Sequence, residues 1–180
     1  MGVRGRRIVP DLDEPTLLGN IDDIIEKAQQ DGLISKYNVD IESIIKQHDI
    51  IIQRDDMSAS ISGYLTKKNG RWIIAVNKNH HKHRQRYTMA HEFAHFCLHK
   101  SENDDYFEDE IFFRDENQTS IEYAANLFAA KLLMPEALIN SSIKAGATSL
   151  KKLAEQFDVS ILAVKNRVIS LGYKITNNEE

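Results

Sequence analysis

The sequence predicts an α+β fold in which a small three-stranded antiparallel sheet packs on one central helix. Most apolar residues recur at the three- and four-residue spacing of amphipathic helices. Short β-branched runs at 50–52, 61–66 and 71–76 break this spacing and indicate strands. The central helix follows the last strand and carries the motif His-Glu-x-x-His at residues 91–95. A further helical segment is expected at the end of the chain.

Length and composition are those of one ordinary globular domain. The chain has 180 residues, of which 42% are hydrophobic and 28% are charged. A formal net charge of -4 and a pI near 6.0 argue against a dedicated nucleic-acid binder, although they allow a local basic patch. The single cysteine, Cys97, forms no internal disulfide, and no apolar run has the length of a membrane span or signal sequence. We therefore expect a cytoplasmic protein that does not act at a membrane.

The chain is expected to begin with a flexible arm and two helices. Residues 1–19 show no periodicity of apolar residues, and charged residues and prolines are frequent there. Helices are expected at about 21–31 and 40–48. Their apolar positions at helical spacing are Ile21, Ile24, Ile25 and Ala28 in the first and Ile41, Ile44 and Ile45 in the second.

The two later strands are expected to form a hairpin that leads into the central helix. Asn69-Gly70 lies between them and supplies the positive φ angles of a tight turn. The residues after the hairpin are basic and rich in histidine, with His80, His81 and His83 close together. These histidines lack the spacing of the motif, so we favour a solvated start of the helix over a second metal site.

An acidic segment at 101–116 follows the central helix. Its acidic residues are Glu102, Asp104, Asp105, Glu108, Asp109, Glu110, Asp115 and Glu116. Aromatic residues interrupt the acids, so we expect a loop or flap that packs in part. Two interpretations stay open. The segment either closes over a cleft and attracts a positively charged partner, or it is a solvated loop without a role.

The remainder of the chain is expected to be helical. Helices are indicated at about 119–134 and 135–145, and residues 150–173 have the pattern helix, turn, helix. We divide the chain into a flexible arm at 1–19, a core at 20–147 that includes the acidic segment, a helix-turn-helix-like subdomain at 148–173 and a tail at 174–180.

Two histidines four residues apart are the strongest chemical signal of the sequence. On a helix, His91 and His95 project from the same face about one turn apart, and imidazole nitrogens are good zinc ligands. Glu92 is placed to take a proton from a metal-bound water as general base. The alternative is a chance match to a short pattern. Small and apolar flanking residues, which suit a helix buried beneath a cleft, favour the functional interpretation.

A catalytic zinc site normally has three protein ligands, so the motif needs one more. His99 lies two helical turns from His91, too far to share one ion with both motif histidines, and we assign it to packing or to support of the ligands. A carboxylate of the acidic segment is a weaker candidate, because a flexible loop holds a ligand poorly. Glu122 is better placed, near the start of a helix. It also completes a capping box with Thr119, in which case it binds no metal.

Two stretches of the sequence carry a specific resemblance. They are Arg86-Tyr87-Thr88-Met89-Ala90-His91-Glu92-Phe93-Ala94-His95-Phe96-Cys97-Leu98-His99 and Glu122-Tyr123-Ala124-Ala125-Asn126-Leu127-Phe128-Ala129-Ala130-Lys131-Leu132-Leu133-Met134-Pro135. Both resemble the ImmA/IrrE family of metallopeptidases, and the likeness extends over residues 37–173. The resemblance implies a zincin-like core in which His91, His95 and Glu122 bind zinc and Glu92 is the catalytic base.

The resemblance also implies a substrate. Members of the family cleave or otherwise relieve helix-turn-helix repressors and so control mobile elements or stress responses in bacteria. We therefore expect a zinc endopeptidase that acts on a lambda-repressor-like transcriptional repressor. Tyr87, His99 and Asn126 are candidates to support the metal ligands or to stabilise the oxyanion. An extended substrate is expected to pair with an edge of the hairpin at 61–76.

Two other functions stay open. One is a DNA-binding regulator that uses residues 150–172. Lys165, Asn166 and Arg167 would face the DNA there, whereas the apolar Ile161 and Leu162 would occupy the start of the reading helix. The other is a component of a toxin–antitoxin pair, on the same scaffold and with little or no peptidase activity.

Overall fold

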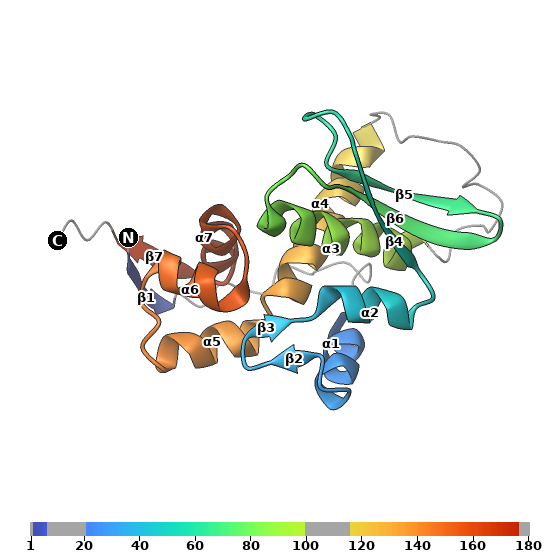
Figure 1. The fold of residues 1–180 in the computed structure, drawn as a ribbon. Helices are drawn as coiled ribbons and strands as arrows, with labels where there is room; N and C mark the ends of the chain where they lie inside the picture. The colour runs from blue at the N-terminus through green and yellow to red at the C-terminus, as the bar shows by residue number, and fades with distance from the viewer. Residues whose placement is uncertain (1, 7–20, 100–115, 177–180) are drawn as a thin grey trace. The chain divides into compact units, whose positions relative to one another are not determined.

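The computed structural model describes residues 2–6, 21–99 and 116–176 (Figure 1). These residues form two compact units. One is Asp40–Ala129, and the other combines the described residues of Met1–Val39 and Ala130–Glu180. Helix α4, Glu116–Leu133, belongs to both units, because the boundary falls within it. No helix of these described ranges has the length and apolar character needed to cross a membrane.

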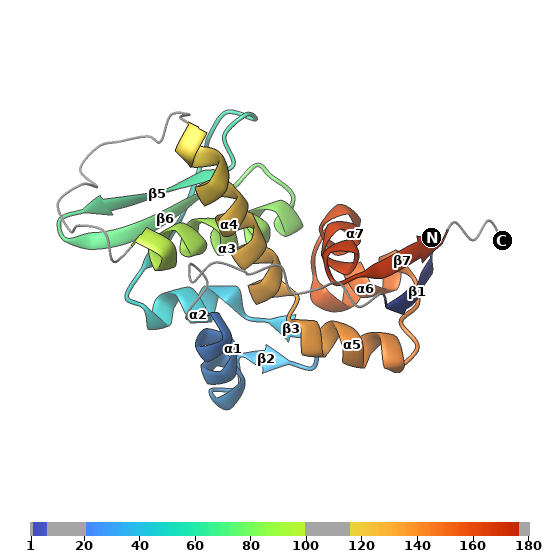
Figure 2. The same ribbon diagram turned by 180° about the vertical axis from the view of Figure 1, so that it is seen from behind.

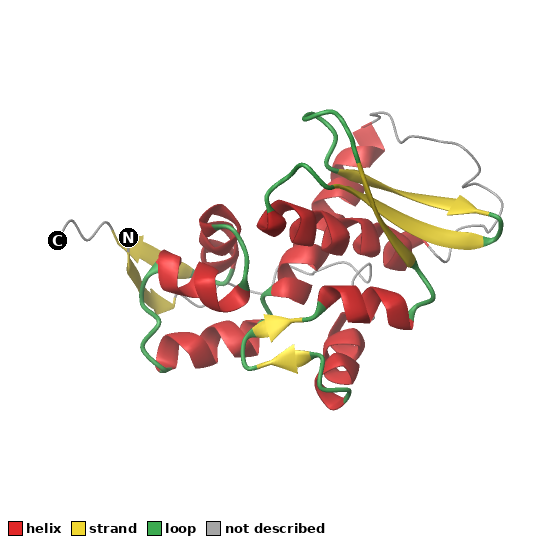
Figure 3. Ribbon diagram, viewed as in Figure 1, coloured by secondary structure: helices red, strands yellow, loops and turns green. Residues whose placement is uncertain are grey.

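The unit Asp40–Ala129 contains a three-stranded sheet and the helix of the His-Glu-x-x-His motif (Figure 3). Its elements are α2 (Ile41–Gln47), β4 (Ile51–Asp55), β5 (Gly63–Lys68), β6 (Arg71–Asn77), α3 (Lys82–His99) and the part of α4 that ends at Ala129. The expected hairpin is present as β5 and β6, with Tyr64 opposite Ala75. Its turn residues Asn69 and Gly70 have φ angles of 51° and 75°, as the hairpin turn requires.

The sheet is mixed rather than antiparallel throughout, and this corrects our expectation. The strand order is β4-β6-β5, and β4 runs parallel to β6, with Ile52 opposite Ile74. After β4, residues 56–62 therefore pass across the end of β6. The chain then enters β5 on the side of β6 opposite to β4. β6 takes the central position because it is the most apolar strand. Its residues Ile74, Ala75 and Val76 are fully buried.

Asn77, at the end of β6, holds the crossing segment in place. Its side chain is fully buried, and Nδ2 donates to the carbonyl oxygens of Met57, Ser58 and Ile61 at 3.2, 2.9 and 2.8 Å. Its backbone N–H donates to the carbonyl of Ser62 at 2.9 Å. The crossing segment contributes no ladder hydrogen bonds of its own, so this one side chain satisfies backbone groups that the sheet does not. The hydrogen bonds of Asn77 thus fix the position at which β5 begins.

Helix α3 packs against α2, β5 and β6. Phe93 on its buried side contacts the rings of His48, Phe96 and Phe128 at centroid distances of 5.0, 6.1 and 6.3 Å. The part of α4 up to Ala129 crosses α3 (Figure 2). An apolar cluster thus holds α3 from several sides.

The other unit is mainly helical. Its elements are β1 (Gly2–Arg6), α1 (Ile21–Gln30), β2 (Ile34–Ser35), β3 (Asn38–Val39), the end of α4, α5 (Glu136–Lys144), α6 (Leu150–Phe157), α7 (Ile161–Ser170) and β7 (Tyr173–Thr176). Ser149 and Ser160 cap α6 and α7, since each hydroxyl accepts from the backbone N–H three residues on. Arg167 is buried, and its Nε donates to the carbonyl of Met134 at 3.1 Å.

A two-stranded sheet joins residues from both ends of the chain. β1 and β7 are antiparallel, with Val3 opposite Ile175. We expected residues 2–6 within the flexible arm and residues 174–176 within the tail. A short strand without alternating polarity gives no local signal when its partner lies at the other end of the sequence. The rest of the arm and of the tail lies outside the described residues, and our four-part division of the chain stays a prediction.

Candidate metal centre

One face of α3 directs three side chains towards α4. Tyr87, His91 and His95 are four residues apart and therefore lie on the same side of the helix. Glu122 and Asn126 of α4 are also four residues apart and face them. Two helices thus present two matching rows of polar side chains. All of these residues belong to the unit Asp40–Ala129.

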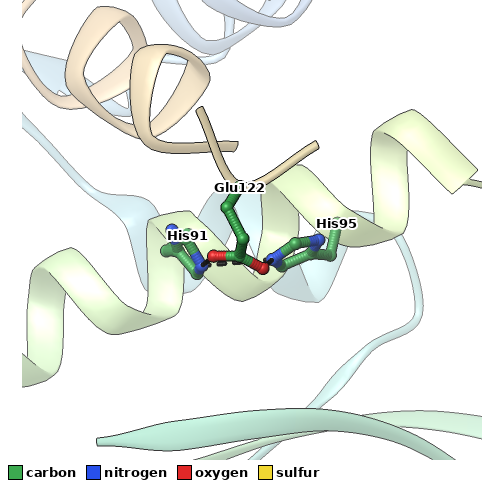
Figure 4. Close-up of side chains that lie close together, drawn as sticks. All are labelled: His91, His95 and Glu122. Atoms are coloured by element: carbon green, nitrogen blue, oxygen red, sulfur yellow. Dashed lines mark hydrogen bonds and ion pairs between the residues drawn. The ribbon is translucent and has the colours of Figure 1, made fainter. Parts of the chain in front are cut away.

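His91, His95 and Glu122 form a close triad (Figure 4). The two histidine Nε2 atoms are 3.1 Å apart. Glu122 lies between the rings, with Oε2 3.2 Å from Nε2 of His91 and Oε1 3.2 Å from Nε2 of His95. The histidine side chains are 17% and 14% exposed, whereas that of Glu122 is 48% exposed. The triad is therefore anchored on a buried helix and open on the side of the glutamate.

The spacing of the triad fits a small four-coordinate metal ion. Zinc bonds of about 2.0–2.1 Å to nitrogen and oxygen, at a tetrahedral angle, place ligand atoms about 3.3–3.4 Å apart. The three measured separations of 3.1, 3.2 and 3.2 Å are close to this value. Two imidazoles and one carboxylate are also a ligand set that leaves a fourth position for water or substrate. Within the described parts of the chain, no other group of His, Cys, Asp or Glu meets the distance requirement for a metal site.

The position of Glu122 in α4 excludes the capping-box interpretation. The helix begins at Glu116, not at Thr119 as we expected. Thr119 is therefore an internal residue of the helix, whereas a capping box needs it at the non-helical N-cap position. Glu122 instead points at the two motif histidines. The side chain of Asn126 donates to the carbonyl of Glu122 at 2.8 Å, one turn further along the helix.

Asn126 and Tyr87 form a chain of hydrogen bonds that ends at His91 of the triad. The Asn126 side chain is hydrogen-bonded to His91, and the Tyr87 hydroxyl donates to Oδ1 of Asn126 at 3.2 Å. Burial raises the pKa of Tyr87, so its hydroxyl keeps its proton as a donor. Two of the three residues that we predicted near the ligands thus lie there. The third, His99, is the last residue of α3, and its side chain lies outside the described part of the structure.

The electrostatics of the triad favour metal-binding forms of the side chains. Burial lowers the pKa of His91, against the opposing effect of the Glu122 charge. A neutral imidazole is the form that binds a metal. A dication at this site would therefore find the His91 nitrogen in the form that binds it.

Glu92 lies next to the triad but faces strand β5. Burial is the main cause that raises its pKa to about 7, and the charge of Glu122 adds to the shift. A hydrogen bond from the backbone N–H of Leu65 in β5 to the Glu92 carboxylate opposes it. Leu65, which contributes this backbone N–H to the site, was missed by the sequence analysis. A backbone donor leaves no trace in residue type, and the only available indication was that the hairpin leads into the motif helix.

Comparison with known proteins identifies the family. The sequence model of the Peptidase_M78 family, described as the IrrE N-terminal-like domain, matches residues 45–168. The chain belongs to this family. The match includes the motif helix, Glu122, helix α6 and α7 up to residue 168. The family resemblance that we inferred from two stretches is therefore confirmed.

A solved structure shows how the IrrE-like chain compares in fold. It is similar to a Mycobacterium tuberculosis transcriptional regulator with a TM-score of 0.60 and 13% sequence identity. The similarity covers 86% of this chain but 46% of that protein, so the chain spans less than half of its length. At this identity the likeness concerns the fold alone. No curated protein sequence matches the chain.

Proposed function

We propose that this IrrE-like chain is a zinc-dependent endopeptidase. The observation that carries the proposal is the triad of His91, His95 and Glu122, whose three ligand atoms lie at the separations that one zinc ion requires. Glu92 lies beside the triad and is close enough to Glu122 for the two charges to interact. A metal-ligand set with a glutamate at its side is the arrangement used for metal-assisted hydrolysis of peptide bonds.

Each residue of the site has a separate task in the proposed reaction. His91, His95 and Glu122 hold the ion, and Asn126 keeps the His91 ring in orientation. Zinc, when bound, polarises the scissile carbonyl and makes a water molecule more acidic. The Glu92 carboxylate accepts a proton from the attacking water and returns it to the leaving amine, so it ends the cycle as it began. The Tyr87 hydroxyl, which burial keeps protonated, holds Asn126.

Strand β5 is the proposed docking edge for the substrate. In the sheet order β4-β6-β5, β5 pairs on one side only among the described strands, and it borders α3. An extended peptide that adds to this edge would gain affinity from backbone hydrogen bonds and little sequence preference. Tyr64 on β5 is 44% exposed and offers an aromatic contact. Selectivity would then depend on further surfaces. The proposed flap at 101–116 lies outside the described residues, apart from Glu116, and its role stays a prediction.

The proposed substrate is a lambda-repressor-like, helix-turn-helix transcriptional repressor in the cytoplasm. Membership of the family supports this choice, and cleavage or inactivation of the repressor would relieve the repression of a mobile element or of stress genes. The test is to mix the zinc-loaded chain with a purified helix-turn-helix repressor encoded beside it. Intact mass spectrometry then detects cleavage, and DNA binding by the repressor reports inactivation. Glu92→Gln is the control for chemistry. A chain that holds zinc but neither cleaves nor inactivates the repressor contradicts the proposal.

DNA binding is the second candidate function. It is favoured by the adjacent helices α6 and α7 and by exposed lysines of this region, including Lys151 and Lys152. Against it, Ile161 and Leu162 at the start of α7 are 51% and 65% exposed, where a reading helix needs polar side chains. Titration of the chain with duplex DNA over a salt series separates the two functions. A steep salt dependence with sequence preference would support a regulator, or a toxin–antitoxin component, with little peptidase activity.

A further inference from the structure

A second face of α3 is fitted to strand β5. Arg84, Thr88 and Glu92 are four residues apart and form a row beside the row of His91 and His95. Each member of this row meets the beginning of β5 or the residue before it. The contacts are Arg84 with Ser62, Thr88 with Gly63 and Glu92 with Leu65. The strand thus follows the helix along two turns. The last of the three contacts is made by Glu92, the proposed catalytic base.

The first and last contacts of this row are polar. Nε and Nη2 of Arg84 donate to the Ser62 hydroxyl at 3.1 and 2.8 Å. The Leu65 N–H donates to the Glu92 carboxylate. Alternate residues of a strand direct their backbone groups to opposite sides, so an N–H that reaches α3 is not available to β6. Leu65 therefore presents its amide on the outer edge of the sheet.

The middle contact is possible only because residue 63 has no side chain. A Cβ placed on Gly63 would lie 2.6 Å from Cγ2 of Thr88 and 2.4 Å from the carbonyl oxygen of Ala75. Both distances are far below van der Waals contact, and one of the two atoms is backbone. Thr88 itself is buried, with 6% exposure, so it has little room to move. Gly63 is needed here for space, and the strand approaches α3 more closely than any other residue would permit.

We propose that Gly63 is a positioning residue that sets the distance between the docking edge of β5 and Glu92. The approach at Gly63 brings Leu65, two residues further on, within reach of the Glu92 carboxylate. The inference rests on the proposed function, because it assigns the substrate to β5 and the base to Glu92. A side chain at residue 63 would clash with Thr88 of α3 as well as with the Ala75 carbonyl of β6, and relief of the first clash would move the strand away from the helix. A bound peptide would move with the strand, and its scissile bond would leave its place beside Glu92.

This role makes a kinetic prediction. In Gly63→Ala, peptide pairing with β5 is preserved, so KM should change by less than about threefold. The displaced scissile bond should lower kcat by about 10- to 100-fold, because reaction rates are sensitive to small misplacements. Zinc content should not change, since all three ligands come from α3 and α4. These parameters are measured on the repressor that the zinc-loaded chain is found to cleave.

A second readout does not depend on activity. Amide hydrogen exchange, followed by NMR on the full-length chain, compares Leu65 with its neighbour Thr66. In the parent chain both amides should be protected. In Gly63→Ala the Leu65 amide should exchange faster while that of Thr66, which faces β6, keeps its protection. Glu92→Ala should give the same pattern by removing the acceptor. Equal acceleration of both amides would mean that Gly63 only stabilises the hairpin, and unchanged protection of Leu65 would overturn the proposal.

Two further variants control for folding. Gly70→Ala strains the hairpin turn, where φ is 75° and no neighbour lies within 4 Å, so it loosens the hairpin without touching α3. In Gly70→Ala, the Leu65 amide should stay at least as well protected from exchange as the Thr66 amide. Thr88→Ser removes the atom that a Cβ at residue 63 would strike first on the helix side. The double variant Gly63→Ala/Thr88→Ser should therefore recover part of the Leu65 protection, and no recovery would contradict the proposed contact. The exchange pattern can hold even where no repressor is cleaved, so it separates this inference from the proposed function.

Discussion

Glu122 of α4 touches both motif histidines of α3, with one carboxylate oxygen 3.2 Å from His91 and the other 3.2 Å from His95. One side chain thus joins two helices at a single point. Its removal should lower zinc affinity by more than about 100-fold, beyond the 10- to 100-fold effect of losing a supporting partner. Zinc content of Glu122→Ala after dialysis against a competing chelator measures this, with Glu155→Ala, an exposed glutamate of α6, as the matched control. Equal zinc retention in both variants would show that the third ligand is elsewhere.

Glu92→Gln should separate binding from chemistry. The amide keeps the size of the side chain and can still accept from the Leu65 amide, but it accepts no proton from water. We expect about one zinc per chain, as in the parent, and a loss of peptidase activity of about 100- to 10,000-fold. Single-turnover cleavage of the repressor is the measurement. A variant that cleaves at the rate of the parent would exclude Glu92 as the base.

Asn126→Ala should weaken zinc binding without removing a ligand. Asn126 is hydrogen-bonded to the His91 side chain, and such partners fix the orientation of a metal-binding ring. Zinc affinity is expected to fall about 10- to 100-fold, measured by competition with a coloured chelator. Tyr87→Phe, which removes only the hydroxyl that holds Asn126, should have a smaller effect in the same direction. An equal or larger effect of Tyr87→Phe would place the tyrosine closer to the metal than we infer.

The stability of the metal-free protein should depend on the protonation of Glu92. Burial raises the pKa of this carboxyl from 4.5 to about 7, so the folded state binds the proton more tightly than the unfolded state. The resulting stability is fully present below about pH 4.5 and is lost as the pH rises through about 7. Glu92→Gln has no such proton. Its free energy of unfolding, relative to the parent, should therefore increase between about pH 5 and pH 8, by at most about 3 kcal/mol.

Urea unfolding of both chelator-treated proteins at the two pH values tests this dependence. The metal must be removed first, because a bound dication favours the ionised carboxylate and lowers its pKa. A difference between the proteins that does not change with pH would assign the effect of the substitution to packing.

Asn77→Ala should destabilise the unit Asp40–Ala129. The substitution leaves the carbonyl groups of Met57, Ser58 and Ile61 without their donor at a buried site. We expect a loss of about 3 kcal/mol in the free energy of unfolding, measured in urea. Asn79→Ala is the control, since the Asn79 side chain bonds to Asp56 at an exposed position and its removal should cost less than about 1 kcal/mol.

The residues of the triad were predictable because each depends on local spacing or on a family motif. His91 and His95 follow from the four-residue repeat of a helix, and their placement side by side needs no tertiary information. Glu122 did not follow from spacing. Its two interpretations differed by where α4 begins, and a helix boundary is set by capping and packing that the pattern of apolar residues does not resolve. The family motif favoured the metal ligand, and the start of α4 at Glu116 agrees with it.

The direction of β4 and the pairing of β1 were not predictable. A β-branched run indicates a strand but does not say which neighbour it joins. β4 is parallel to β6 because Asn77 stabilises a crossing of the sheet by residues 56–62, and that interaction joins residues about 20 positions apart. β1 is ordered by β7 at the opposite end of the sequence. The Leu65 amide and the space at Gly63 are properties of the backbone, which appear only when the strand is placed on the helix.

The triad also has a mechanical consequence. A metal ion held by His91, His95 and Glu122 acts as a reversible cross-link between α3 and α4 and closes the loop of chain from residue 95 to residue 122. Loop closure by such a clip stabilises mainly by restricting the unfolded chain, as a disulfide does. Withdrawal of the metal should therefore loosen the first turns of α4 before it affects the buried side of α3. Availability of zinc would set how much of the protein is folded as well as how much is active.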